Sequence, residues 1–128
     1  MDPIDMELSR AQAKPLRVAA FDSAMQQARQ CYRSGEAGTA FVLLERAHVL
    51  GQRDFGRHLR VHLAMLRVAW ALNDGREVRG QLLRLLLTPI GHLTRRLPPG
   101  NTGASDVSAF APMPVSAELR QLLDEEKT

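Results

Sequence analysis

The sequence predicts an all-α domain, built as a four-helix array of two helical hairpins and followed by an extended C-terminal arm and a short last helix. Three observations predict this class. Apolar residues recur at helical spacing in four successive segments, and glycine-containing turns separate those segments. The composition is rich in leucine, alanine and arginine, whereas aromatic residues make up only 5% of the chain. With 128 residues, 45% of them hydrophobic, the chain is long enough to bury one core.

The chain divides into three parts. Residues 1–20 show no hydrophobic period and predict a flexible lead-in. Residues 21–96 contain the helices of the domain, and residues 97–128 predict an arm that packs on them. The expected helices span about residues 21–34, 36–51, 56–72 and 76–92, with a last one over 116–123.

Local signals predict how these helices begin and end. Asp22 or Ser23 suits the N-cap of the first helix, and Gly51 suits a left-handed residue after the second. The fourth helix is apolar almost all round, which predicts that it is the central, most buried helix. Pro89 lies inside it and should kink or end it about one turn early.

The helix–glycine–helix spacing is also similar to tetratricopeptide repeats, with Tyr32, Gly35, Ala40 and Ala47 at matching positions. This likeness covers about two repeats. It implies a protein–protein interaction module.

Composition excludes several other classes. The net charge is +3 and the basic residues are spread along the chain, which argues against nucleic-acid binding. The single cysteine excludes a disulfide framework. The acidic N-terminus does not resemble a signal peptide, and no segment approaches the ~20 apolar residues of a membrane span. We therefore expect a cytoplasmic protein without a membrane partner.

A histidine-rich stretch is the candidate functional site. If the turn between the second and third helices is centred near residue 53, an antiparallel hairpin brings His48 to the height of His58, and Glu45 to that of His62. Glu45 and His48 are three residues apart on one helix, and His58 and His62 are four apart on the next. Imidazoles with one carboxylate suit zinc, nickel, copper or iron. The predicted metal ligands are therefore Glu45, His48, His58 and His62.

Other interpretations of the histidines and Glu45 are also compatible with the sequence. The histidines could make ordinary structural hydrogen bonds near a loop, with Glu45 paired to Arg57 or Arg60. A di-iron centre would need a second Glu-x-x-His motif, which the chain lacks. His92 is expected to face solvent at the end of the fourth helix, where it would interact favourably with the helix dipole.

Catalytic patterns are weak. We find no Ser-His-Asp arrangement, no paired carboxylates beside an expected cleft, and no glycine-rich phosphate loop after a strand. The cluster Pro98-Pro-Gly-Asn-Thr-Gly103 could form a small anion-binding nest, but a structural turn is the simpler interpretation. We expect a protein that is not an enzyme; a small enzyme that uses the histidine cluster for acid–base chemistry is a third hypothesis.

Several motifs resemble a small bacterial family known only as a domain of unknown function. They are Leu44-Glu-Arg-Ala-His48-Val-Leu-Gly-Gln52, His58-x-x-x-His62-x-x-Met-Leu66, Gly80-Gln-x-x-Arg84 and Pro99-Gly-Asn-Thr-Gly103. The resemblance extends from about Phe21 to Leu119. It implies no activity, although such proteins look at home beside heavy-metal resistance genes.

The sequence thus favours a non-enzymatic protein with a His/Glu site for a divalent metal and a metal-handling or metal-resistance accessory role. The alternative is a tetratricopeptide-like interaction module with structural histidines. Its surplus of leucine on the fourth helix predicts a protein partner or a homodimer.

Overall fold

The structure is a computed structural model that describes residues 2–5, 15–95, 97–109 and 111–124. All regular secondary structure in these residues is helical, which confirms the predicted all-α class. The elements are α2 (Leu16–Arg33), α3 (Ala37–Gly51), α4 (Phe55–Ala71), α5 (Gly75–Thr94) and α6 (Ala117–Asp124). Of the predicted lead-in, residues 1 and 6–14 lie outside the described residues, and α2 already begins at Leu16.

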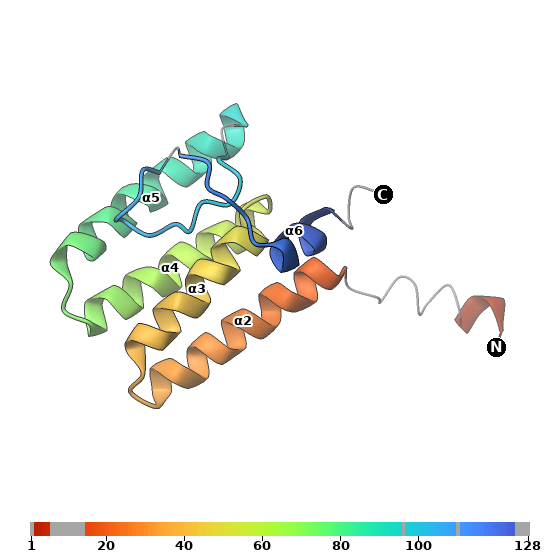
Figure 1. Ribbon diagram of the computed structural model, residues 1–128, viewed down its shortest axis with the longest axis horizontal. Coiled ribbons are helices and arrows are strands. Elements are labelled where there is room, and N and C mark those ends of the chain that lie inside the picture. The colour runs from red at the N-terminus through yellow and green to blue at the C-terminus, as the bar shows by residue number, and fades with distance from the viewer. Residues whose placement is uncertain (1, 6–14, 96, 110, 125–128) are drawn as a thin grey trace.

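The four long helices follow one another in an up-and-down array (Figure 1). α3 packs between α2 and α4, and α5 packs on the other side of α4. The core lies among the first three of these helices, where small alanines let the backbones approach and a few large side chains fill the space. Its large members, all fully buried, are Phe21, Leu44, Leu50, Val61 and Met65. Burying each side chain of this size stabilises the fold by about 1.5–3 kcal/mol.

Two tight turns set the helix ends. Gly35 has a φ of 82° between α2 and α3, a conformation that glycine adopts without strain. Asp74 caps α5, because its side chain accepts a hydrogen bond from the Glu77 amide. The expected caps of α2 are wrong: Pro15 precedes the helix, and it makes no side-chain cap.

Gly51 has a different role from the one predicted. It is the last residue of α3 and has no positive φ. A Cβ atom there would lie 2.6 Å from the Phe21 ring. Glycine is therefore needed for the close approach of α2 to the end of α3, and not for a left-handed conformation.

The placement of α5 corrects the expectation that this helix is the most buried. Its buried residues are Gln81, Arg84 and Thr88, which are polar and recur at helical spacing. Most of its leucines face outwards: Leu86 is 72% exposed and Leu93 86% exposed, whereas Leu85 and Leu87 are half-buried. An all-round apolar pattern does not say which face packs, and here the packed face is the polar one. The helix also continues through Pro89 to Thr94, so that the proline does not end it early.

The chain beyond α5 returns along that helix before it reaches α6 (Figure 1). Arg84 donates to the Val107 carbonyl oxygen, and the Ser105 amide donates to the Glu77 carboxylate. At the far end, α6 lies against α2 and α3. We call residues 97–109 the covering segment. Of the predicted arm, residues 110 and 125–128 lie outside the described residues.

Among the helices of the described residues, none is long and apolar enough to cross a membrane. The tetratricopeptide likeness stays a prediction.

Candidate metal centre

Three histidines from two antiparallel helices meet inside the protein. His48 lies in the last turn of α3, and His58 and His62 lie on successive turns of α4. All three side chains are buried. Four-residue spacing places the two α4 histidines on one face of the helix, and the short loop between the helices turns that face towards His48.

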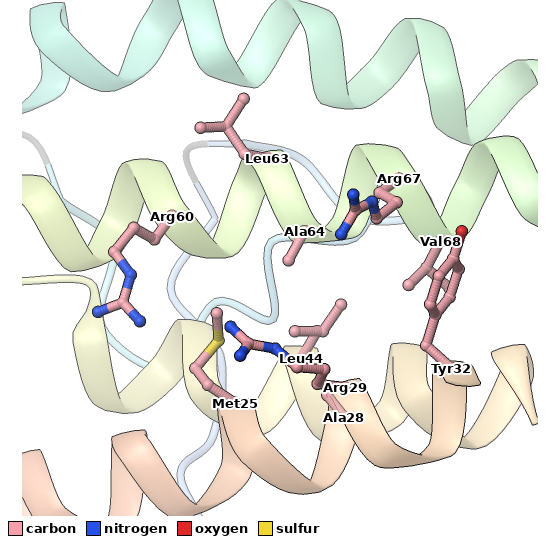
Figure 2. A pocket seen from close by; sticks show the side chains of 10 residues that line it. All are labelled: Met25, Ala28, Arg29, Tyr32, Leu44, Arg60, Leu63, Ala64, Arg67 and Val68. Carbon is pink, nitrogen blue, oxygen red and sulfur yellow. The ribbon is translucent and has the colours of Figure 1, made fainter. Parts of the chain in front are cut away.

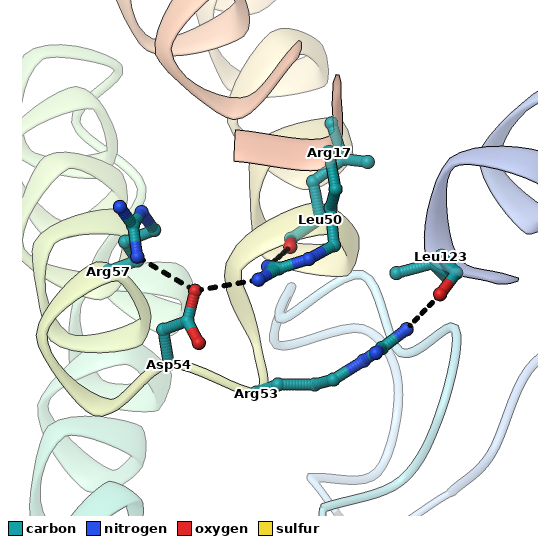
Figure 3. Close-up of polar contacts among 6 residues, drawn as sticks. All are labelled: Arg17, Leu50, Arg53, Asp54, Arg57 and Leu123. Carbon is teal, nitrogen blue, oxygen red and sulfur yellow. Dashed lines mark hydrogen bonds and ion pairs between the residues drawn. The ribbon is translucent and has the colours of Figure 1, made fainter. Parts of the chain in front are cut away.

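An ion-pair cluster fixes this loop. Asp54 accepts hydrogen bonds from Arg17 of α2 at 3.0 Å and from Arg57 of α4 at 2.8 Å (Figure 3). Arg17 also donates to the Leu50 carbonyl oxygen near the end of α3. Although burial raises the pKa of Asp54, the hydrogen bonds and charges of the two arginines outweigh it and lower that pKa. The cluster therefore ties three helices together next to His58.

The Nε2 atoms of the three rings form a nearly equilateral triangle. The distances between them are 3.0 Å from His48 to His58, 3.2 Å from His48 to His62 and 3.1 Å from His58 to His62. Nitrogen ligands at about 2.0–2.1 Å from a tetrahedral zinc ion lie roughly 3.3–3.4 Å apart. The triangle is thus close to one face of such a tetrahedron.

Each outer ring nitrogen has a partner of its own. His48 Nδ1 donates to the Asn101 carbonyl oxygen at 2.6 Å. His62 Nδ1 donates to Gln81 Oε1 at 2.7 Å. His58 Nδ1 lies 2.9 Å from His92 Nε2. Outer partners of this kind orient the imidazole ligands of metal sites.

The orientation of the Gln81 amide is fixed by its other contacts. Its nitrogen donates to Glu77 Oε1 at 2.9 Å and to the Gly103 carbonyl oxygen at 2.8 Å, and both of these atoms are acceptors. The amide oxygen must therefore face His62, whose Nδ1 carries the hydrogen. The same reasoning places a hydrogen on His48 Nδ1, because a carbonyl oxygen only accepts.

The covering segment closes the site through two residues. Asn101 is buried, and its amide donates to the carbonyl oxygens of Ser108 and Ala111 while its Oδ1 accepts from the Gly103 amide. Gly103 has a φ of 79°, and a Cβ atom there would lie 2.5 Å from the His48 ring. Hydrogen bonds within the C-terminal part of the chain thus hold the turn, and the Gly103 backbone packs directly against the His48 ring.

Burial keeps the cluster neutral. It lowers the pKa of His58 to about 3, with further contributions from His62 and His92. It lowers the pKa of His62 to about 4, although the hydrogen bond to Gln81 opposes the effect. The pKa of His48 also falls well below its ordinary value, through burial and the neighbouring histidines. Neutral imidazole is the form that binds metals.

The fourth predicted ligand lies apart from this cluster. The three histidines form a group that could hold a metal ion, and the Glu45 carboxylate is not in it. Burial raises the pKa of Glu45, as do Asp106 and Glu77, while a hydrogen bond with Thr102 opposes the rise. Glu45 therefore faces the covering segment one helical turn before His48.

The expectation of a solvent-facing His92 is wrong. It is half-buried against His58, and its ring also lies edge-on to Phe55 with 5.3 Å between the ring centroids. All four histidines of the chain thus belong to one cluster. Gln81, Arg84 and Asn101 were not predicted as site residues, although the motifs that carried the family resemblance contained all three.

A small cavity adjoins the triangle. Its volume is about 40 Å³, and its lining includes the three histidines, Arg84 and Thr88. Space for one water molecule corresponds to roughly 30 Å³ of liquid volume. An ion on the triangle would therefore have room for a small fourth ligand.

The helical array and the cluster define a small all-α protein with a buried three-histidine group that could hold a metal ion. The chain belongs to the family described as Protein of unknown function (DUF3703), which it matches over residues 16–123. This confirms the resemblance to an uncharacterised family. Neither the comparison with curated proteins nor the comparison with solved structures finds a match.

Proposed function

We propose that the protein binds one divalent transition-metal ion through the Nε2 atoms of His48, His58 and His62, and that zinc is the preferred ion. An ion about 2.0–2.1 Å from each nitrogen would lie roughly 1 Å out of their plane. Three imidazoles without a carboxylate suit zinc, copper or nickel better than magnesium or calcium, which prefer oxygen ligands.

The observation that carries the proposal is the direction of the hydrogen bonds. His48 and His62 donate from Nδ1 to oxygens that only accept. When these rings are neutral, their Nε2 atoms carry lone pairs, and the two atoms lie 3.2 Å apart. His58 can place at most one hydrogen between the three nitrogens. A bound cation would turn these opposed lone pairs into ligands.

The burial of the three histidines favours a tightly bound ion over a rapidly exchanging one. The covering segment packs against His48 through Asn101 and Gly103, and we expect it to slow the exchange of a bound ion. We extend the proposal to a metal-handling or metal-resistance accessory role, in which the protein sequesters an ion and no chemical reaction is required. Deleting the gene should then lower the concentration of that metal at which the host stops growing.

The decisive experiment is metal binding by the untagged protein. Elemental analysis should find close to one equivalent of metal. Calorimetry with zinc should give a dissociation constant in the micromolar range or below at pH 7. The substitutions His58→Ala and His62→Ala should each weaken binding by more than 100-fold.

The matched control is His92→Gln, which keeps all three ligand nitrogens and an amide next to His58. Its zinc affinity should fall by 10–100-fold at most, which is the usual effect of changing a residue that hydrogen-bonds to a metal ligand. Equal zinc binding by wild type and His58→Ala would refute the site, and so would the absence of zinc, nickel and copper binding by the folded wild type.

The exposed apolar face supports a second candidate, a protein–protein interaction module. A hollow of about 350 Å³ between α4 and α5 is lined by Leu63, Leu66, Trp70 and Leu82 among others, and Trp70 is 76% exposed. Apolar surface of this kind commonly marks a contact with another protein. The occupant would be a protein partner or a second copy of the chain.

A further groove for such a partner adjoins this hollow and shares Leu63 and Arg67 with it. It has a volume of about 400 Å³ and lies between α2 and α4. Figure 2 shows Met25 and Leu44 there, with Arg29, Arg60 and Arg67 around them. Apolar residues bordered by arginines suit an amphipathic segment that carries carboxylates.

Light scattering with size-exclusion chromatography tests this candidate. A dimer that Trp70→Glu converts to a monomer would support it. A monomer at all concentrations, with no binding of acidic amphipathic peptides, would refute it. Neither outcome depends on metal.

A further inference from the structure

The groove between α2 and α4 is lined by three arginines and by no carboxylate of the described residues. Arg29 comes from α2, and Arg60 and Arg67 come from α4, so that both helices bring positive charge to the groove (Figure 2). None of the ion pairs within the described parts of the chain involves these three side chains. The groove therefore suits a ligand that carries carboxylates.

Aromatic and apolar side chains accompany these charges. The Arg60 guanidinium lies 5.6 Å from the centroid of the Phe21 ring, and that of Arg67 lies 5.9 Å from the centroid of the Tyr32 ring. The groove also presents apolar surface to solvent, and Leu63 is 55% exposed. Apolar surface between charges of one sign fits a peptide segment that combines apolar residues with carboxylates.

The chain carries a segment of this composition before α2. Apolar and acidic residues alternate from Ile4 to Leu8. Residues 2–5 lie away from the helical array (Figure 1), and Ile4 is 65% exposed. Residues 1–9 contain no basic side chain and three acidic ones, which are Asp2, Asp5 and Glu7. The charge and the apolar residues of this segment are thus complementary to those of the groove.

The connection to α2 is long enough for the segment to reach the groove. α2 begins at Leu16, and Arg29 lies about 20 Å further along this helix. The chain from Asp5 to Pro15 can span up to about 33 Å when extended. Because the segment is tethered, its effective concentration at the groove is on the order of millimolar. A contact of modest affinity is therefore enough to keep it bound.

We propose that residues 2–8 dock in the groove between α2 and α4 of the same copy of the chain. Ile4 and Leu8 cover the apolar surface of the groove, while Asp5 and Glu7 pair with its arginines. Burial of the two aliphatic side chains supplies most of the attraction, and the charges determine the orientation. The segment then covers a groove that an acidic partner would have to share or clear. This inference rests on neither of the functions proposed above.

A nitroxide spin label on the full chain tests the docking, because it broadens the NMR signals of backbone amides close to it. The label is attached to Pro3→Cys in a Cys31→Ser background, which keeps every acidic and aliphatic residue of the segment. The docked segment should broaden the amides of residues 25–32 and 60–68 most strongly. Broadening confined to the first turns of α2, or absent from the helical array, would overturn the proposal.

Charge reversal in the groove tests the role of the arginines. Arg60→Glu combined with Arg67→Glu should reduce the broadening of the groove amides by about fivefold or more. Arg76→Glu combined with Arg79→Glu is the matched control, since both arginines are exposed on α5, and it should leave the broadening unchanged. Equal broadening in both folded variants would overturn the proposal.

Neutralising the segment gives the same test without touching the helices. Asp2→Asn, Asp5→Asn and Glu7→Gln together should produce a similar loss of broadening, and they decide the question even if the arginine variant fails to fold. The matched control neutralises two acids at the other end of the chain, Glu125→Gln and Glu126→Gln, and should change nothing. Undiminished broadening in the neutralised segment would overturn the ion pairs and with them the proposal.

A mixed sample distinguishes the possible occupants of the groove. Spin-labelled protein without ¹⁵N is mixed with ¹⁵N-labelled protein without the spin label. Broadening of the groove amides in this mixture would show that the segment docks on a second copy, and it would overturn docking within one copy. Binding of an added acidic peptide in the groove, without docking of residues 2–8, would overturn this inference and leave the interaction module standing.

Discussion

Gln81 and Asn101 each present an oxygen to a histidine, and an oxygen of this kind can only accept a hydrogen bond. At the residue scale, these two acceptors decide the chemistry of the cluster, because they leave the Nε2 atoms of His48 and His62 as lone pairs. The histidines alone would be equally compatible with a set of mutual hydrogen bonds.

Gln81→Leu tests the importance of this orientation. The substitution leaves the Nδ1–H of His62 without its acceptor, and it frees the ring to turn. We expect zinc affinity to fall 10–100-fold. Leaving a buried donor unpaired should also cost about 1–3 kcal/mol of unfolding free energy. Gln27→Leu, on the exposed face of α2, is the control, and calorimetry with urea denaturation gives both quantities. An unchanged affinity in Gln81→Leu would contradict the role of this oxygen.

Gly103→Ala tests the contact between the covering segment and the site. Both Gly103 and Gly35 have positive φ, but a Cβ atom would meet the His48 ring at 2.5 Å in the first case and nothing within 4 Å in the second. Gly35→Ala should therefore cost only about 1 kcal/mol, for its backbone conformation. Gly103→Ala should cost at least twice as much and should weaken zinc binding, as measured by urea denaturation and calorimetry. Equal losses of stability and no effect on zinc would show that the segment does not constrain His48.

The sequence predicted the three central histidines of this cluster but not the residues that hydrogen-bond to them. His48, His58 and His62 belong to one hairpin, so that their heights follow from the position of its turn. The partner of His48 lies 53 residues further along the chain, in a segment without regular structure. No local period relates Asn101 or His92 to the hairpin, and their positions depend on how α5 and the covering segment pack.

At the element scale, periodicity predicted where the long helices lie, including α5, but it predicted the wrong degree of burial for α5. α5 has more leucines than one packed helix face can hold, and this apolar pattern alone predicts that the whole helix is buried. The polar side chains of Gln81, Arg84 and Thr88 are buried instead, because most of their donors find hydrogen-bond acceptors. Gln81 donates to the Gly103 carbonyl oxygen and Arg84 to that of Val107, both on the covering segment. Thr88 donates to the Arg84 carbonyl oxygen within α5. Those acceptors come from a segment whose path the sequence does not show.

The exposure of α5 predicts an unusual tolerance of polar substitution in a leucine-rich helix. Leu86→Gln and Leu93→Gln should each change the unfolding free energy by no more than about 0.5 kcal/mol. Leu44→Ala, in the core, should cost about 2–5 kcal/mol. Urea denaturation at two protein concentrations provides the measurement. A large, concentration-dependent loss in Leu86→Gln would mean that a second copy covers this face.

At the scale of the whole molecule, the histidine cluster links stability to pH. The hairpin, α5 and the covering segment all contact the cluster, so that protonating it disturbs each of them together. In the folded protein the pKa of His58 is about 3 and that of His62 about 4, whereas an unfolded histidine titrates near ~6.5. Between these values the unfolded chain binds protons that the folded chain does not.

Stability should therefore be greatest above about pH 6.5 and should fall as the pH falls towards 4. Each buried histidine contributes up to about 1.4 kcal/mol per pH unit to this slope. Denaturation of the metal-free protein in a chelator, from pH 7.5 to 4.5, gives the slope directly. His62→Gln cannot titrate at that position, so that its slope should be smaller by about one proton even if its absolute stability differs. Zinc should raise the melting temperature at pH 7 and lose this effect as protons displace it. A melting temperature that stays constant between pH 7 and 5 without metal would contradict a neutral, buried cluster.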